Sequence, residues 1–449
     1  MTRHVVRDRA ELEAEEARRL APWAIRSTEA VRLRAADREG PSARPDFQRD
    51  RDRILHARAF RRLKHKTQVF VPHIADHPRT RLTHTLEVSQ LARSIARALG
   101  LNEDLTEAVA LGHDLGHTAF GHTGEKVIDE ILRGRSSELR LPDEVVDAVG
   151  AFKHNYQSVR VVDLLEWRYD HPGLNLCNQV REGILKHTGW TPDFDFPLPE
   201  RDGLALDRPC HLEGQAVAVA DEIAQQTHDL EDGLRAGSVA FEAVEELAVS
   251  QRVIDALGDR YRSEPRRWLR QSTLIRELIG LFVTDAIDAS GRRLGAFVED
   301  HGIDDHEQWL AHAHDVPRNT IWFSEEIADD FNRLKSFIYQ FIINHIDVNR
   351  QDWRARKVVT ALFRAFWTNP LTLPSYVLLR AKTELGFPYL RDVPLAAVAD
   401  EVAGRYHTSA GFARLIADHI AGMSDRFALE EYGSLEMPAP NQRFGGPRT

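Results

Sequence analysis

The stretch from Arg81 to Glu125 constrains the fold of this chain more than any other. Apolar residues from Leu82 to Leu99 recur at the spacing of an amphipathic helix, and His84 stands on the same inward stripe. A second helical pattern runs from Glu103 to Asp114, and glycines then punctuate the chain before a third helix begins near Gly121. The stretch therefore predicts three successive helices, with histidine and acidic side chains on their inner face and at their ends.

Helical spacing recurs along most of the remaining chain, and strand alternation is rare. Residues 292–298 are the best strand candidate. We predict an all-α fold with additional C-terminal helices and minimal β structure. The pattern divides the chain into a charged N-terminal extension, a helical core, a helical C-terminal region and a flexible tail. These four parts are residues 1–48, 49–235, 236–432 and 433–449.

The composition excludes several classes of protein. No apolar run approaches the roughly 20 residues that span a bilayer, and the N-terminus lacks the apolar core of a signal peptide, so we expect a cytoplasmic protein without a membrane partner. The two cysteines, Cys177 and Cys210, allow neither a disulfide framework nor a thiolate zinc site. The formal net charge of −10 argues against a general nucleic-acid coat. A polyanionic substrate would therefore need a local basic patch.

Such a patch is present between Arg49 and Lys66. The segment holds eight lysine and arginine residues against two aspartates, and its apolar residues recur at helical spacing. One interpretation is a solvated helix face. The other is a basic wall that faces an anion, and a neighbouring phosphate site would favour it.

The adjacent pair His113 and Asp114 is the first candidate for metal binding. Neighbours on a helix point about 100° apart, so both side chains reach one point only near a helix end or a bend, which Gly116 would supply. Imidazole nitrogen and carboxylate oxygen suit Mn²⁺, Fe²⁺, Co²⁺, Mg²⁺ or Zn²⁺. His84 would be a third ligand, although a single histidine on an apolar face is more often a hydrogen-bonded core residue.

Asp221 is the fourth candidate, because it follows five consecutive apolar residues, 216–220. A carboxylate in that position is expected to be buried, and burying it without a partner is costly. The partner would be a metal ion or, alternatively, an arginine. Two histidines and two aspartates would leave coordination positions open for water and substrate, as catalytic sites do.

His117, His122 and Glu125 follow the His-Asp pair. His122 and Glu125 are three residues apart, so on a helix they share a face, and a carboxylate that holds an imidazolium favours a proton donor. The alternative is an ordinary first helical turn with incidental histidines. Eight of the chain's 21 histidines lie between His56 and His122, and this density favours a site.

The residues His84, His113-Asp114 and Asp221 resemble the H…HD…D signature of the HD-domain phosphohydrolases. The longer string HDLGHTAFGHTGE is similar to the deoxyguanosinetriphosphate triphosphohydrolase-like (dGTPase or dNTPase) branch of that superfamily. Further segments with the same similarity, in the same order, are RDRILHARAFRRLKHKTQVF, RTRLTHTLEVSQLARSIAR, FKHNYQSVRVV, REGILKHTG, ADEIAQQTHDLEDGL, LKSFIYQFI and IAGMSDRFALEEYGSL. The resemblance covers the chain from about Arg49 to Leu435 and implies an HD-domain helical core.

The resemblance also implies roles for individual residues. The metal would be held by His84, His113, Asp114 and Asp221, with Mn²⁺ or Mg²⁺ as the expected ion and Fe²⁺, Co²⁺ or Ni²⁺ as further candidates. The expected catalytic residues are His122 with Glu125 as a dyad, and His117 beside the α-phosphate and sugar. The expected substrate contacts are Arg81 for the α-phosphate, Gln68 near the sugar, Asp229 for the 3′-hydroxyl and Lys186 for the outer phosphates. A guanidinium binds a phosphate through two parallel hydrogen bonds, which makes Arg81 physically reasonable.

One position departs from the family pattern. Four residues after Asp221 the family usually has a tyrosine near the sugar and phosphate, and this chain has Gln225. The departure puts the exclusion of ribose, the grip on phosphate and the base preference in doubt, whereas the fold and the metal site do not depend on it.

The activity that the resemblance implies is hydrolysis of a dNTP, with dGTP among the candidates, to a deoxynucleoside and inorganic triphosphate. The alternatives are another HD-type activity, a deoxynucleoside monophosphatase or a phosphodiesterase, and a non-catalytic sensor of nucleotides or single-stranded nucleic acid. The resemblance also implies a homo-oligomer, an activating nucleotide and single-stranded DNA as partners, and the charge of the chain does not support the last of these.

Overall fold

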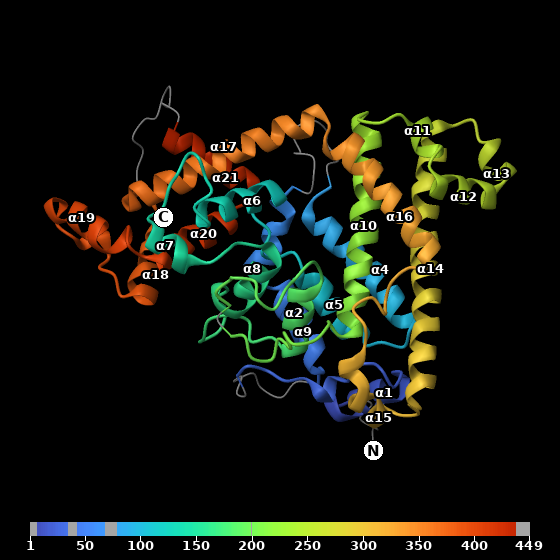
Figure 1. Cartoon of the computed structure of the whole chain (residues 1–449). Coiled ribbons are helices and arrows are strands. Elements are labelled where there is room, and N and C mark those ends of the chain that lie inside the picture. The colour runs from blue at the N-terminus through green and yellow to red at the C-terminus, as the bar shows by residue number, and fades with distance from the viewer. Residues whose placement is uncertain (1–6, 35–42, 68–78, 199, 437–449) are drawn as a thin grey trace, which may run out of the picture.

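The computed structural model describes residues 7–34, 43–67, 79–198 and 200–436. Within these ranges the regular structure is helical, and extended pairing is limited to two isolated antiparallel bridges, Arg32 with Cys177 and Thr67 with Thr80 (Figure 1). The predicted all-α fold is therefore confirmed. No helix in the described ranges combines the length and apolar character needed to cross a bilayer.

A central group of helices surrounds the candidate site. The helix α4 packs against both α5 and α10, and α2 covers α5 from another side. These helices and those next to them are α1 (Arg9–Arg19), α2 (Asp46–Leu55), α3 (Arg58–Arg62), α4 (Arg81–Ala98), α5 (Glu103–Gly112), α8 (His154–Arg160), α9 (Asn178–Lys186) and α10 (Leu212–Ala236).

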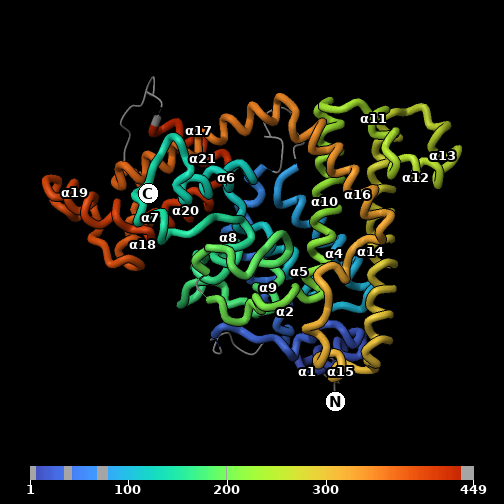
Figure 2. Tube along the Cα trace, viewed as in Figure 1, coloured from blue at the N-terminus to red at the C-terminus, as the bar shows by residue number. Residues whose placement is uncertain are grey.

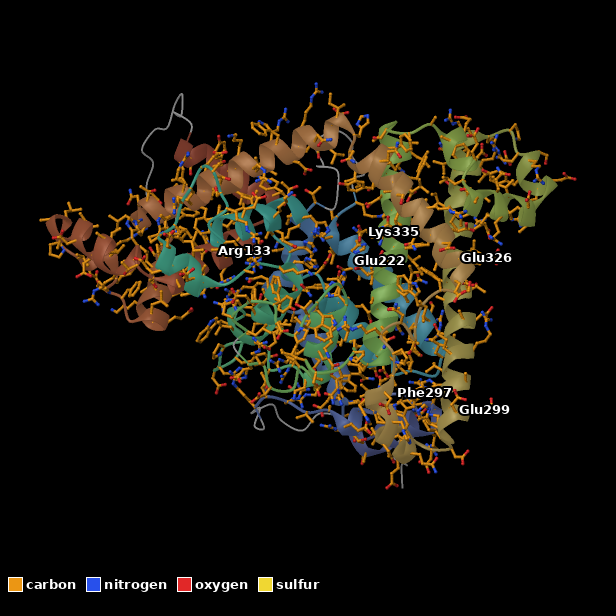
Figure 3. The ribbon with its side chains drawn as sticks, viewed as in Figure 1. Arg133, Glu222, Phe297, Glu299, Glu326 and Lys335 are labelled. Atoms are coloured by element: carbon orange, nitrogen blue, oxygen red, sulfur yellow. The ribbon has the colours of Figure 1, made fainter. Side chains whose placement is uncertain are left out.

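A second group extends the central one along α10. The long helix α14 packs against α10 and α4, and α16 packs against α10 and α12 (Figure 1). Lys335 of α16 forms an ion pair with Glu222 of α10 at 2.7 Å, next to Asp221 (Figure 3). The helices of this group are α11 (Phe241–Glu245), α12 (Ala248–Leu257), α13 (Asp259–Arg262), α14 (Arg267–His301), α15 (His306–His312) and α16 (Glu325–Ile338).

A third group brings two distant parts of the chain together. Figure 2 shows α6 and α7 among the C-terminal helices, and α6 packs against both α17 and α20. The helices are α6 (Gly121–Leu132), α7 (Asp143–Val149), α17 (Ile346–Thr368), α18 (Ser375–Leu385), α19 (Leu395–Glu401), α20 (Ala410–Ala421) and α21 (Asp425–Glu436).

The described residues form two hydrophobic cores, and neither ends at residue 235, where the sequence suggests a boundary. The larger core runs from Ala24 to Ile342 and includes helices on both sides of that point. The smaller core joins residues 119–152 to residues 358–428. The C-terminal helices therefore share a core with α6 and α7, because the apolar face of α6 is turned towards them.

The helices that carry the site begin at side-chain caps. The Thr80 hydroxyl accepts a hydrogen bond from the Thr83 N–H at the start of α4, and Asn102 caps α5 through the N–H groups of Asp104 and Leu105. His211 caps α10 through Gly214 N–H. Each cap fixes where its helix begins, and so sets which side chains face inwards.

The strand expected at residues 292–298 is wrong, because this segment lies inside α14. Leu294 is buried, and Phe297 and Val298 pack against the same core, so the apolar residues follow the three- and four-residue spacing of a helix. At the C-terminus α21 continues to Glu436, so the first four residues of the expected tail are helical. Residues 437–449 lie outside the described ranges.

Candidate metal and phosphohydrolase site

The structure brings all four predicted metal ligands together. The His84 Nε2 atom of α4 lies 2.9 Å from the Asp221 Oδ1 atom of α10. From the end of α5, His113 Nε2 lies 3.7 Å from the same Asp221 oxygen and 3.5 Å from Asp114 Oδ1. Ligand atoms of His84, His113 and Asp221 thus lie within 4.8 Å of one another, and among the described residues Asp221 contacts histidines rather than an arginine.

A turn with tight packing places His113 and Asp114. The helix α5 ends at Gly112, and residues 113–116 form the turn. Ser158 of α8 holds this turn, because its hydroxyl donates to the His113 carbonyl at 2.7 Å and accepts from Gly116 N–H at 2.8 Å. A Cβ atom at Gly116 would lie 2.2 Å from the Ser158 nitrogen, so only glycine fits. The bend expected at Gly116 is therefore present.

The hydrogen bonding of His113 fits a metal ligand. Its Nδ1 atom lies 2.6 Å from the Ala110 carbonyl, which can only accept, so Nδ1 carries the proton. The Nε2 atom then presents a lone pair, and it is buried without a hydrogen-bond partner in the described structure. A buried polar atom without a partner needs an explanation. A divalent cation with mixed nitrogen and oxygen ligands is a fitting one.

The two aspartates are held in the charged form. Burial would raise the pKa of Asp114, but the charges of His113, His117 and Arg81 outweigh it and hold this pKa well below its usual range. Burial would raise the pKa of Asp221 as well, but the hydrogen bond from His84 and the charge of His113 outweigh burial and hold this pKa below its usual value. Both carboxylates are therefore available as anionic ligands.

A second cluster adjoins the first. His117 Nε2 lies 3.1 Å from Asp114 Oδ1, and the ring of His117 stacks on His154 with centroids 3.9 Å apart. The candidate ligand atoms of His117, His122, Glu125 and His154 lie within 4.8 Å of one another. His122 is the solvent-exposed member of this set.

The hydrogen bond expected within the His122–Glu125 dyad is replaced by another. Glu125 Oε2 accepts from His154 Nδ1 at 2.6 Å and from the His154 backbone N–H at 3.3 Å. Burial would raise the pKa of Glu125, but the contact with His154 lowers it to about 2. The physical reason is that His154 begins α8, where a free backbone N–H and a ring nitrogen both face the carboxylate. His122 interacts with Glu125 through charge only.

Three further histidines, none of them a candidate from the sequence, lie in or beside the two clusters. His154 and His187 have ring nitrogens within 4.8 Å of an Asp114 oxygen and of each other. His228 Nδ1 lies 3.3 Å from His84 Nδ1. Spacing would have found His228, because it lies seven residues after Asp221 on the same face of α10. His154 and His187 come from the motif segments FKHNYQSVRVV and REGILKHTG, and only the fold shows that they approach Asp114.

The predicted substrate contacts have mixed outcomes. Arg81 is buried at the site, where it donates to Asp114 Oδ2 at 2.7 Å, while its Nε atom has no hydrogen-bond partner among the described residues. Gln225 is half-buried one turn after Asp221. Asp229 is buried on the same helix, and burial together with the neighbouring Asp232 raises its pKa to about 8. Gln68 lies outside the described residues.

The outer-phosphate role of Lys186 conflicts with its contacts. Its ammonium group donates to Glu182 Oε1 at 2.9 Å, to the Ala205 carbonyl at 2.6 Å and to the Arg208 carbonyl at 2.9 Å. An ammonium group has three donors, so none is left for a phosphate. Lys186 instead ties α9 to the loop before α10.

The basic segment 49–66 also divides into different roles. Arg51 forms ion pairs with Asp52 and Glu107, and Arg53 donates to backbone carbonyls. Lys66 is buried, its ammonium donates to the carbonyls of His117 and Ala421, and burial lowers its pKa to about 7. The buried end of the segment, Lys66, therefore supports the His117 backbone. The segment as a whole does not form a continuous basic wall facing an anion.

Comparisons with known proteins agree with this geometry. Residues 81–225 match the HD domain, and residues 321–434 match the phosphohydrolase-associated domain. A deoxyguanosinetriphosphate triphosphohydrolase-like protein of Brucella anthropi is 40% identical over 432 residues, which cover 93% of this chain and 96% of that protein. One from Bordetella pertussis is 40% identical over 399 residues, or 88% of this chain and 91% of that protein. The chain therefore belongs to the family of deoxyguanosinetriphosphate triphosphohydrolase-like proteins and carries the HD domain of the phosphohydrolases.

Proposed function

We propose that this protein is a metal-dependent triphosphohydrolase that converts a dNTP into a deoxynucleoside and inorganic triphosphate. One observation carries the proposal: ligand atoms of His84, His113 and Asp221 lie within 4.8 Å of one another, Asp114 lies 3.5 Å from His113, and the buried His113 Nε2 has no hydrogen-bond partner among the described residues. The names of the relatives support the triphosphate substrate.

These four residues would hold the divalent cation, Mn²⁺ or Mg²⁺. When bound, such an ion supplies a Lewis acid for a phosphoryl oxygen and lowers the pKa of water. Arg81 has an unpartnered Nε beside Asp114 and would orient the α-phosphate. Water adds to the α-phosphorus, and the bond between phosphorus and the 5′-oxygen breaks.

The departing 5′-oxygen needs a proton, and the second cluster is placed to provide it. Glu125 accepts a hydrogen bond from His154 Nδ1 and orients that ring, and His122 is the ring of this set that solvent reaches. We therefore assign proton donation to His122 and His154 and the supporting role to Glu125. Asp229 would receive the 3′-hydroxyl, and its raised pKa allows its carboxyl group to donate as well as accept.

The test is a product assay with each of the four dNTPs, alone and in pairs, with Mn²⁺ or Mg²⁺ and metal analysis of the purified protein. Release of inorganic triphosphate together with deoxynucleoside is expected. Release of single phosphates from deoxynucleoside monophosphates would instead favour the monophosphatase alternative. Protein that retains its metal and releases triphosphate from no dNTP, alone or paired, would exclude this function.

We also propose a homo-oligomer in the cytoplasm. Four large apolar side chains stand exposed on adjoining segments at the junction of α16 and α17, and such a group is typical of an interface. They are Tyr339, Phe341, Ile346 and Trp353. Light scattering on the purified chain tests this, and a monomer at all concentrations would contradict it.

A further inference from the structure

Two histidines face each other across the contact between α4 and α10. The Nδ1 atoms of His84 and His228 lie 3.3 Å apart, and the two rings meet edge to face with an angle of 80° between their planes. On its other side, the Nε2 atom of His84 faces Asp221, while the Nε2 atom of His228 contacts the Glu87 carboxylate. A line of contacts therefore runs from Glu87 through two imidazole rings to the candidate metal ligands.

This line begins near solvent and ends in the buried site. The Glu87 side chain is 45% exposed, whereas the side chains of His228 and His84 are 4% and 3% exposed. Arg79 lies 3.7 Å from Glu87 and pairs more closely with Glu231, at 3.0 Å. Because the two rings are buried, loss of the contact between them leaves a buried polar atom without a partner, which is costly.

The outer end of the line fixes the proton of His228. Burial would raise the pKa of Glu87, but the hydrogen bond from His228, with Arg79 nearby, holds this pKa below its usual value. An ionised carboxylate only accepts hydrogen bonds, so the Nε2 atom of His228 carries a proton. In a neutral ring the other nitrogen is an acceptor, and here that nitrogen is the Nδ1 atom that faces His84.

The inner end of the line requires the same arrangement. A metal-ligating His84 presents the lone pair of Nε2, so its proton is on Nδ1, and that N–H needs an acceptor. The Nδ1 atom of His228 is this acceptor, at 3.3 Å. Both ends therefore lead to one assignment, in which each ring donates outwards, His84 to His228 and His228 to Glu87.

The second histidine ligand shows why His84 needs such a partner. His113 follows the last turn of α5, where backbone carbonyls are free, and its Nδ1 atom donates to the Ala110 carbonyl at 2.6 Å. His84 stands near the start of α4, where the carbonyls are bonded within the helix. Side chains from α4 and α10 therefore do for His84 what the backbone does for His113.

We propose that Glu87 and His228 are positioning residues for the metal ligand His84, because their hydrogen bonds hold its proton on Nδ1 and its Nε2 lone pair towards the metal. This inference rests on the metal site of the proposed function. It adds two residues that neither ligate the ion nor contact the substrate. Partners of this kind, behind a ligating histidine, set its orientation and its basicity as a ligand.

The experiment measures the Mn²⁺ affinity of the metal-free full chain by equilibrium dialysis. His228→Leu removes the acceptor for His84 and is expected to weaken Mn²⁺ binding by about 10- to 100-fold. His228→Asn places an amide oxygen close to the position of the histidine Nδ1 atom. It should therefore retain the acceptor and keep the affinity within about threefold of the wild type.

Glu87→Ala should have a smaller effect, about three- to tenfold, because water replaces an exposed carboxylate in part. Its matched control is Glu231→Ala, which removes another carboxylate paired with Arg79 but makes no contact with His228 among the described residues. The control should leave the affinity within about twofold. This pair of variants decides the question if His228→Leu does not fold.

A role confined to holding α4 against α10 predicts a different pattern. The free energy of unfolding of each metal-free variant, measured in urea, would then account for its change in affinity. His419→Leu is the control for this alternative, because it removes a buried histidine in the smaller core, away from the metal ligands. It should lower stability and leave the Mn²⁺ affinity within about twofold.

The proposal is overturned if His228→Leu binds Mn²⁺ within twofold of the wild type, or if His228→Asn is as weak as His228→Leu. It is also overturned if Glu231→Ala matches Glu87→Ala, or if His419→Leu weakens binding as much as His228→Leu. A wild-type chain that binds no Mn²⁺ at millimolar concentration overturns both this inference and the proposed function. Affinities in the expected order without release of triphosphate would overturn the proposed function alone.

Discussion

The two sides of the turn from His113 to His117 differ sharply in chemistry although one backbone forms both. The metal side is buried and combines imidazoles with carboxylates, each within hydrogen-bond or ligand distance of another. The opposite side borders a cavity lined by exposed aromatic rings, by two carboxylates, and by Arg58 and Arg62, whose guanidinium groups have no ion pair within the described ranges. Gly116 separates them, and it packs directly against the backbone of α8. The absence of a side chain at Gly116 thus lets the turn lie directly against α8, with the cavity beside it.

The largest expected effect is confined to the metal side. Asp221→Asn removes one anionic ligand, and we expect metal content to fall and triphosphate release to drop by about a thousandfold or more, because the cation supplies several kcal/mol of charge stabilisation. Elemental analysis and turnover measure both effects. Asp288→Asn, an exposed carboxylate on α14, is the control. Full activity in Asp221→Asn would refute the assignment of the metal side.

Gly116→Ala should destabilise the turn that carries His113 and Asp114 and that also borders the cavity. The added Cβ would lie 2.2 Å from the Ser158 nitrogen and 2.3 Å from the His154 carbonyl oxygen, and neither backbone atom can move freely. We expect a loss of about 3 kcal/mol in the free energy of unfolding. Urea unfolding measures it, with Gly280→Ala as the control, since a Cβ there meets nothing within 4 Å. Equal stability of the two variants would show that the packing of Gly116 against α8 is not tight.

Lys186→Met tests whether Lys186 stabilises the fold or binds the outer phosphates of the substrate. It leaves Glu182 and two backbone carbonyls without their donor, so we expect a loss of about 2 kcal/mol in stability. The KM for dNTP should change little, because the ammonium group has no donor left for a phosphate. The exposed Lys382→Met is the control. A large rise in KM with unchanged stability would restore the outer-phosphate role.

His419 gives the smallest effect and belongs to the cavity side. Burial, with Arg380 and Arg62 nearby, lowers its pKa to about 3, whereas an unfolded histidine titrates near 6.5. The unfolded chain therefore binds the extra proton between these values, and stability falls as the pH drops below about 6.5. His419→Gln should reduce this slope by up to about 1.4 kcal/mol per pH unit. Urea unfolding at several pH values measures this dependence of stability on pH, with the exposed His314→Gln as control. If the slope of stability against pH is unchanged in His419→Gln, His419 protonates in the folded state.

Most of the helices were predictable from spacing, but their partners were not. Leu82 to Leu99 and the helix starting at Gly121 were expected almost as α4 and α6 are found, because amphipathic spacing is a local property. Residues 292–298 were misread because seven residues give little evidence of period, whereas the whole of α14 shows a helical one. That α6 shares a core with α17 depends on contacts more than 200 residues apart in the chain, and no local pattern records them.

The candidate metal ligands could be proposed from the sequence because a buried carboxylate after an apolar run and a His-Asp pair at a helix end are costly without a cation, wherever they occur. What only the tertiary structure decided is the partner of each polar group. Glu125 bonds His154 rather than His122, and Lys186 is saturated by Glu182 and two carbonyls. Arg58 and Arg62 line a cavity whose two carboxylates, Glu166 and Asp418, accept from backbone N–H groups, Gln157 and Arg160. Hydrogen bonds and ion pairs act over a few ångströms, so these choices depend on how distant helices pack.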